Sequence, residues 1–131
     1  MPVERVLVVE DSAVIQRLVW ACLHQAGVEI DARTDGPSGL EAALTTPPDL
    51  LILDVGLPHM DGWEVLEHLR ADPRTRRLKV LVLTAHAQEE TRDRAGAGGA
   101  DAFITKPFRP DDLRRVAVGL LRGVAAGVGP A

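Results

Sequence analysis

Five short apolar runs alternate with segments of helical spacing, and this alternation restricts the possible folds more than any other feature. The runs lie at residues 6–9, 28–32, 50–53, 80–83 and 102–104. Three of them are continuous and rich in valine, leucine and isoleucine, as expected of strands covered on both faces. Strands that alternate with helices form a parallel sheet through right-handed crossovers. The sequence therefore predicts an α/β, doubly wound fold with helices on both faces of the sheet.

The segments between the runs have the spacing and the end signals of helices. Apolar side chains recur at steps of three and four residues in the first and last segments. Asp61 and Glu64 have the spacing of a capping box, in which each residue bonds to the backbone of the other. Gly27 marks the end of the first helix, and Pro37 and Pro110 lie at the starts of the second and the last. Helices are therefore expected at residues 14–27, from Pro37, from Asp61, at 88–95 and from Pro110.

The length of the chain limits it to one domain, and its charge disfavours binding to nucleic acid or to an acidic membrane. The 131 residues suffice for one hydrophobic core, and the net charge of -4 offers no general attraction for nucleic acid or an acidic membrane. The basic residues at 74, 76, 77 and 79 have no aromatic residues between them, so a solvated loop is expected. The single cysteine, Cys22, excludes an internal disulfide and is expected to fill the core. Without a signal-peptide pattern or a membrane-length apolar run, a cytoplasmic protein is expected.

Polar side chains follow four of the five apolar runs. Because the carboxyl ends of parallel strands meet at one edge of a sheet, these side chains are expected to lie together. Carboxylates, a hydroxyl and an ammonium group are suited to handling a phosphoryl group. The residues concerned are Glu10 and Asp11 after the first run, Asp54 after the third, Thr84 after the fourth and Lys106 after the fifth.

In this order and spacing, four stretches of the chain resemble the receiver domain of two-component response regulators. They are "VLVVEDS", "PDLLILDVGLPHMDGWEVL", "VLVLTAHA" and "GGADAFITKPF", and the resemblance extends over residues 6–121. It implies a flavodoxin-like (βα)5 three-layer sandwich with sheet order 2-1-3-4-5, similar to single-domain chemotaxis regulators. Residues 1–122 are then the receiver domain, and residues 123–131 are expected to be a flexible C-terminal tail.

The resemblance also implies a role for each acidic residue. Asp54 looks like the phosphoacceptor. Clustered carboxylates raise one another's pKa unless a cation lies between them, and Mg²⁺ prefers oxygen ligands. The expected cofactor is therefore Mg²⁺ (or Mn²⁺). Its expected ligands are Asp11, Asp54 and the backbone carbonyl of Gly56, with Glu10 acting through water.

A second group is expected to bind the phosphoryl oxygens and to switch conformation. By resemblance it comprises Thr84, the backbone of Ala85, Lys106 and Phe103. Many relatives have tyrosine where this chain has Phe103, and the chain contains no tyrosine, so this side chain offers no hydroxyl to a partner. The bond between Lys106 and Pro107 is a candidate cis peptide, because the lysine has to turn back into the site at a tight bend.

Three further residues have expected roles at the rim of the site or on the surface. Gly56 and His86 lie two residues after Asp54 and Thr84, and they are expected to tune the lifetime of the phosphoryl group. Trp20 falls off the apolar stripe of its helix. Its ring is either partly covered by long neighbouring side chains or part of a docking surface for the phosphodonor, and the sequence favours the two roles equally. The four histidines have no metal-ligand spacing, so solvated surface positions are expected for all of them.

The implied function is acceptance of a phosphoryl group by Asp54 from a sensor histidine kinase or a histidine phosphotransfer protein. The modified domain would change conformation and control a downstream protein. It would catalyse its own phosphorylation and dephosphorylation, without classical turnover. No direct contact with nucleic acid or membrane is expected.

Other functions are considered beside this one. A degenerate receiver would act as a protein-interaction adaptor, but the five key positions are filled. An aspartyl-phosphate phosphatase, as in the haloacid dehalogenase superfamily, places a second acid two residues after a nucleophile on the first strand; here that residue is Gly56. No P-loop glycine pattern supports nucleotide binding, and the acidic pair disfavours a flavin phosphate. A complete single-domain regulator and a receiver cut from a longer protein both remain open.

Overall fold

The computed structural model describes residues 3–57, 59–85 and 99–123, which form a single parallel sheet with helices on both faces. The strands are Arg5–Val9 (β1), Glu29–Arg33 (β2), Leu50–Asp54 (β3), Lys79–Thr84 (β4) and Ala102–Thr105 (β5). Their order in the sheet is β2-β1-β3-β4-β5. This is the flavodoxin-like order that the resemblance predicts, so the predicted fold class is confirmed.

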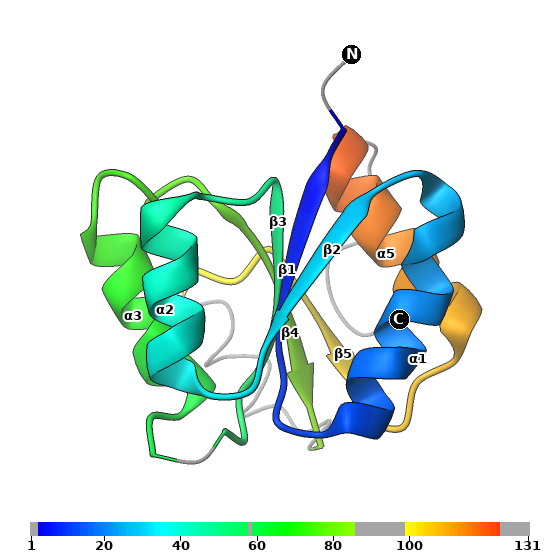
Figure 1. Ribbon diagram of the computed structural model, residues 1–131, viewed down its shortest axis with the longest axis horizontal. Helices are drawn as coiled ribbons and strands as arrows, with labels where there is room; N and C mark the ends of the chain where they lie inside the picture. The colour runs from blue at the N-terminus through cyan, green and yellow to red at the C-terminus, as the bar shows by residue number, and fades with distance from the viewer. Residues whose placement is uncertain (1–2, 58, 86–98, 124–131) are drawn as a thin grey trace.

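The helices form the two outer layers of a three-layer sandwich. They are Ala13–Leu23 (α1), Gly36–Thr45 (α2), Gly62–Ala71 (α3) and Pro110–Arg122 (α5), with a short 3-10 helix at His24–Ala26 (η1). Figure 1 shows α2 and α3 on one face of the sheet and α1 and α5 on the other. The helix expected at 88–95 lies outside the described residues.

Alternate side chains of the buried strands supply the two halves of the core. Val8, Ile52 and Leu83 belong to the cluster that includes residues of α1 and α5, whereas Val9, Leu53 and Val82 belong to the cluster on the α2 and α3 side. Both faces of β3 are therefore apolar and buried. This explains why the central strands appear in the sequence as continuous apolar runs.

Helix capping explains where the helices begin. Asp61 accepts a hydrogen bond from the backbone N–H of Glu64 at 3.0 Å, so the predicted start of α3 is confirmed. Asp35 caps α2 in the same way through Ser38, and α2 begins at Gly36, one residue before the predicted start at Pro37. The first helical segment ends at Gly27, whose φ of 77° lies in the left-handed region that favours glycine.

Edge strand β2 differs from the other strands in its exposure. Its side chains are exposed or half-buried, and it pairs only with β1 among the described strands. The corresponding apolar run at 28–32 is the weakest of the five, and the strand itself lies one residue later.

Cys22 is buried as predicted. Within the described part of the chain, no helix has the length and apolar character that would span a membrane.

The register of the strands places the polar residues at their carboxyl ends next to one another. Val9 pairs with Leu53, Asp54 with Leu83, and Thr84 with Thr105. The residues that follow β1, end β3 and β4, and follow β5 therefore leave the sheet side by side. This register positions the candidate site.

Candidate functional site

Asp54 lies at the centre of the polar edge, as the last residue of β3. It is only 5% exposed, although it is an ionisable residue. Its Oδ1 accepts a hydrogen bond from the backbone N–H of Gly56 at 3.0 Å and lies 3.3 Å from Lys106 Nζ. One carboxylate oxygen is thus held by two donors, which fixes the orientation of the side chain.

Glu10 and Asp11, the residues that follow β1, have different environments. Glu10 is fully buried, and its Oε2 accepts a hydrogen bond from the backbone N–H of Ser12 at 3.0 Å. Its Oε1 lies 2.6 Å from Lys106 Nζ. Asp11 is exposed. The two neighbours therefore offer one buried and one accessible carboxylate at the same edge.

Ligand oxygens of Glu10, Asp11 and Asp54 all lie within 4.8 Å of one another. Three carboxylates this close repel one another, and a cation between them would remove that repulsion. The donor set consists of oxygen atoms with one accessible member, which fits a hard divalent cation such as Mg²⁺.

Lys106 carries the positive charge in the described part of this cluster. Burial by itself would lower the pKa of Lys106, but its hydrogen bond to Glu10 and the charge of Asp54 outweigh burial and place this pKa above its ordinary value. Burial raises the pKa of Glu10, and the hydrogen bond from Lys106 opposes that effect only in part. Lys106 therefore remains a cation, positioned between two acidic side chains.

The predicted switch residues lie close to this cluster. Thr84 ends β4 and is buried, and its backbone carbonyl accepts a hydrogen bond from the backbone N–H of Lys106 at 2.6 Å. Ala85 follows and is exposed. Phe103 is buried in the core cluster on the α2 and α3 side. The peptide bond between Lys106 and Pro107 is cis, the isomer expected at this bend.

The lifetime-tuning positions are only partly described. Among the described residues, a Cβ atom added at Gly56 would meet only Asp54 Oδ1 within 4 Å, at 3.7 Å, which is an ordinary van der Waals contact. His86 lies outside the described residues. The geometry therefore supports a test at Gly56 alone.

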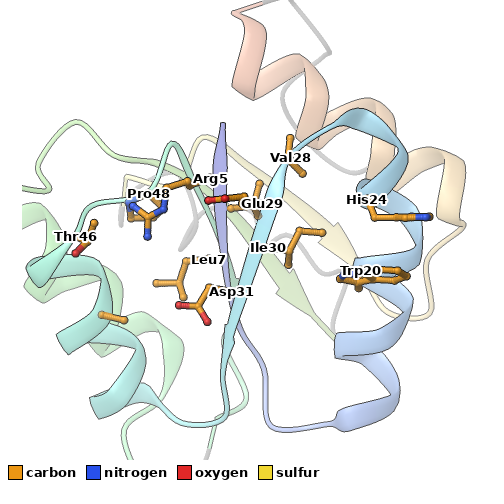
Figure 2. Close-up of a pocket in the computed structure, with 12 residues that line it drawn as sticks. Arg5, Leu7, Trp20, His24, Val28, Glu29, Ile30, Asp31, Thr46 and Pro48 are labelled. Atoms are coloured by element: carbon orange, nitrogen blue, oxygen red, sulfur yellow. The ribbon is translucent and has the colours of Figure 1, made fainter. Parts of the chain in front are cut away.

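Trp20 lies on α1, beside edge strand β2, and the residue is 52% exposed, in agreement with its position off the apolar stripe. Its ring stacks on that of His24, with centroids 4.3 Å apart and planes at 18°. Both rings line a pocket of about 570 Å³. Figure 2 shows them with Val28 and Ile30, which line the same pocket. The stacking on His24 was not predicted; it covers one face of an otherwise exposed indole.

Ser12 and Gln16 also support the acidic pair, and sequence reasoning assigned neither of them. Ser12 caps α1 through its Oγ, which accepts from the N–H of Ile15, and its own N–H binds Glu10. A serine directly before a helical run is a recognisable cap signal. Gln16 donates to the backbone carbonyl of Glu10 at 2.6 Å. No sequence signal predicts that contact.

Comparisons with known proteins agree with this geometry. The response regulator receiver domain model matches residues 6–117. The phosphate regulon transcriptional regulatory protein PhoB of Escherichia coli (strain K12) is 40% identical over 109 residues, which are 83% of this chain and 48% of PhoB. The chain thus spans about half the length of curated relatives such as PhoB.

Two solved structures show the same fold. The chemotaxis response regulator CheY4 of Vibrio cholerae has a TM-score of 0.85 and 30% identity, covering 91% of this chain and 99% of that one. The receiver domain of sensor histidine kinase PA1611 from Pseudomonas aeruginosa PAO1, solved with a magnesium ion coordinated in its active site cleft, has a TM-score of 0.84 and 27% identity, covering 92% and 99%. On the family match and on this architecture, the chain belongs to the response regulator receiver domain family of two-component systems.

Proposed function

We propose that Asp54 accepts a phosphoryl group from a phosphohistidine on a sensor histidine kinase or a histidine phosphotransfer protein. A carboxylate oxygen of Asp54 attacks phosphorus, so a P–O bond forms while the P–N bond to the donor imidazole breaks. The observation that carries the proposal is the convergence of Glu10, Asp11, Asp54 and Lys106, from the ends of three strands, in one cluster of charged side chains.

The main task of such a site is to stabilise charge on the transferring phosphoryl group. The Lys106 ammonium already lies 3.3 Å from Asp54 Oδ1, so it is placed to bind a phosphoryl oxygen attached to that carboxylate. The Gly56 N–H orients the carboxylate before transfer. Thr84 and the backbone N–H of Ala85, at the adjacent strand end, would bind the remaining oxygens.

Mg²⁺, or Mn²⁺, would be held by Asp11, Asp54 and the backbone carbonyl of Gly56, with Glu10 acting through water. When bound, the ion supplies positive charge against the phosphoryl oxygens. Support comes from the three carboxylates within 4.8 Å and from the magnesium ion in the related PA1611 receiver. The direct contact of Glu10 with Lys106 gives this residue a second task, which is to hold the ammonium in place.

The downstream effect would follow from a change in conformation. Phosphorylation would draw Thr84 and Lys106 toward the new group, and the buried Phe103 on β5 would stabilise one of the two states. A downstream protein in the cytoplasm would recognise that state. The domain would also remove its own phosphoryl group by hydrolysis, so it would be a signalling component without classical enzymatic turnover.

Intact mass spectrometry tests this proposal. The protein is incubated with Mg²⁺ and acetyl phosphate, and it is expected to gain the mass of one phosphoryl group. Asp54→Asn should lose the adduct, and Asp112→Asn, the same change on the half-buried surface of α5, should retain it. No adduct in the wild type, or an adduct that persists in Asp54→Asn, would refute the assignment.

A separate experiment tests the proposed docking role of Trp20. If the phosphodonor contacts this exposed ring, Trp20→Ala should slow transfer from the cognate donor while leaving phosphorylation by acetyl phosphate unchanged. Transfer at the wild-type rate from both donors would leave partial surface cover as the role of Trp20.

A further inference from the structure

The backbone of the loop between β1 and α1 determines where the acidic pair points. Glu10 and Asp11 are consecutive, and Asp11 is exposed, so packing does little to restrict its side chain. The peptide units on both sides of Glu10 are held instead. The N–H of Glu10 donates to the carbonyl of Arg33 at the end of β2 at 3.0 Å. Whatever holds the carbonyl of Glu10 therefore orients the peptide that leads into Asp11.

Gln16 holds that carbonyl. Its Nε2 donates to the carbonyl oxygen of Glu10 at 2.6 Å and lies 3.4 Å from the carbonyl oxygen of Arg33. Both partners are acceptors, so only the NH₂ end of the amide can satisfy them. A single side chain thus links the carboxyl ends of two neighbouring strands, β1 and β2.

Gln16 is itself firmly placed relative to the loop. Its backbone N–H donates to the carbonyl of Ser12, which closes the first turn of α1, and the Ser12 side chain caps the same turn. Ser12 also donates its N–H to the Glu10 carboxylate. The loop and the first turn of the helix therefore form one hydrogen-bonded unit around Glu10.

From these contacts we infer that Gln16 is a positioning residue for the cation site, acting through the Glu10 carbonyl on the direction of the Asp11 and Glu10 carboxylates. The inference rests on the proposed function, because it concerns the site at which Mg²⁺ would bind. Gln16 is not among the residues proposed to bind the phosphoryl group or the ion. Its loss should raise the Mg²⁺ concentration that the site requires and leave the maximal rate of phosphorylation near the wild-type rate.

Gln16→Met is the first variant, because methionine keeps the length of the side chain and removes the N–H donors. Gln25→Met makes the same change on the exposed surface of η1 and is the matched control. Calorimetry with MgCl₂ is expected to give roughly tenfold weaker binding for Gln16→Met, the lower end of the range for residues that orient metal ligands. The half-maximal Mg²⁺ concentration for phosphorylation by acetyl phosphate should shift equally, and Gln25→Met should match the wild type.

Amide hydrogen exchange in EDTA gives a readout that needs neither metal nor activity. The Glu10 amide, bonded to Arg33, should exchange faster in Gln16→Met than in the wild type. Gln16→Arg retains N–H donors toward the two carbonyls and should restore slow exchange. Restoration by this variant would distinguish positioning by a donor from a general loss of packing.

The outcomes separate this inference from the proposed function. A folded Gln16→Met that binds Mg²⁺ like the wild type overturns the inference alone. A wild type that neither binds Mg²⁺ nor becomes phosphorylated overturns both. If Gln16→Met does not fold, Gln16→Glu replaces it. The ionised carboxylate of this variant cannot donate a hydrogen bond, and its added negative charge by itself would tighten Mg²⁺ binding. Weaker Mg²⁺ binding by Gln16→Glu would therefore support the positioning role, and tighter binding would overturn it.

Discussion

At the scale of single residues, two glycines near Asp54 have opposite tolerances. Among the described residues, a Cβ at Gly56 would have Asp54 Oδ1 at 3.7 Å as its one neighbour within 4 Å. A Cβ at Gly62 would collide with the Asp54 carbonyl oxygen and would lie 2.5 Å from Val55 Cα. Gly62 thus allows α3 to begin directly against the end of β3, whereas at Gly56 the described part of the chain leaves space for a side chain.

Gly56→Met is therefore expected to fold normally and to prolong the life of the acyl phosphate. An apolar side chain there would hinder the approach of water to phosphorus, so hydrolysis should slow by roughly tenfold, or about 1.4 kcal/mol in the barrier. Loss of the phosphoryl adduct, followed by intact mass after removal of acetyl phosphate, measures the rate. An unchanged rate in a series of Gly56 substitutions would contradict the tuning role.

Gly62→Ala is expected to destabilise the protein, because the new Cβ would overlap backbone atoms of Asp54 and Val55, which cannot move as freely as the end of a side chain. We expect a loss of about 1–3 kcal/mol in the free energy of unfolding, the usual range for overpacking. Urea denaturation measures this loss, and Gly56→Ala is the matched control. Equal stability of the two alanine variants would show that α3 shifts without cost.

The half-buried Asp72 and the exposed Arg74 form an ion pair, and the direction in which pH changes its stabilising effect follows from the pKa of Asp72. Hydrogen bonds from the Arg74 side chain and backbone hold the pKa of Asp72 at about 2, below its ordinary value of 3.8. The ionised form is favoured in the folded state, so its stabilising effect is complete above the ordinary pKa and is lost as the pH falls toward 2. Arg74→Met should raise the Asp72 pKa toward 3.8 in an NMR titration, and Arg77→Met should leave it unchanged.

At the scale of elements, Arg70 joins α3 to the amino ends of two strands. Its guanidinium donates to the carbonyls of Gly99 and Leu78 and lies 3.3 Å from Asp101 Oδ2. Asp101 in turn accepts from the N–H of Val80, at the start of β4. The side chain of Arg70 is only 20% exposed, and its hydrogen bond to the Leu78 carbonyl is partly buried, whereas its hydrogen bond to the Gly99 carbonyl is exposed.

Arg70→Met is expected to lower the free energy of unfolding by about 2–3 kcal/mol, because partly buried carbonyls would lose a charged donor. Urea denaturation measures this loss. Arg114→Met, on the exposed surface of α5, is the control and should change stability little. If both variants unfolded at the same urea concentration, the Arg70 contacts would be without net stabilising effect.

These elements also show how far the sequence allows prediction. Buried parallel strands appear as apolar runs, and the Asp61 cap needs only local chemistry, so both could be predicted. The edge strand β2 is half-exposed, and its run is weak for that reason. The contacts of Gln16 and Arg70 could not be predicted, because their partners are backbone carbonyls, and any residue type supplies a carbonyl. The Glu10–Lys106 contact spans 96 residues and depends on the sheet order.

At the scale of the whole molecule, the amino and carboxyl ends of the strands differ in how their charged side chains are paired. At the amino ends of β4 and β5, Arg70 and Asp101 form an ion pair, so each charge has a partner of opposite sign. The carboxyl edge gathers Glu10, Asp11 and Asp54 within 4.8 Å, and Lys106 is the described cation beside them. Functional sites are commonly kept at some cost in stability. The carboxyl edge is therefore where a bound cation should change the stability of the entire domain.

Asp11→Asn tests this relation between site and stability. In EDTA the variant should be more stable than the wild type by about 0.5–1 kcal/mol, because one of three clustered negative charges is removed. Mg²⁺ should raise the thermal midpoint of the wild type, since a ligand at a hundredfold excess over its dissociation constant stabilises by about 2.7 kcal/mol. The same Mg²⁺ concentration should shift the midpoint of Asp11→Asn far less.

Asp112→Asn serves as the control, because it removes a carboxylate that lies on α5, outside the cluster. It should respond to Mg²⁺ like the wild type. The order of the two proteins should thus reverse: Asp11→Asn the more stable in EDTA and the wild type the more stable in Mg²⁺. If Asp11→Asn gained as much from Mg²⁺ as the wild type does, the cation would bind without this carboxylate, and the stability of the domain would not be linked to the cluster.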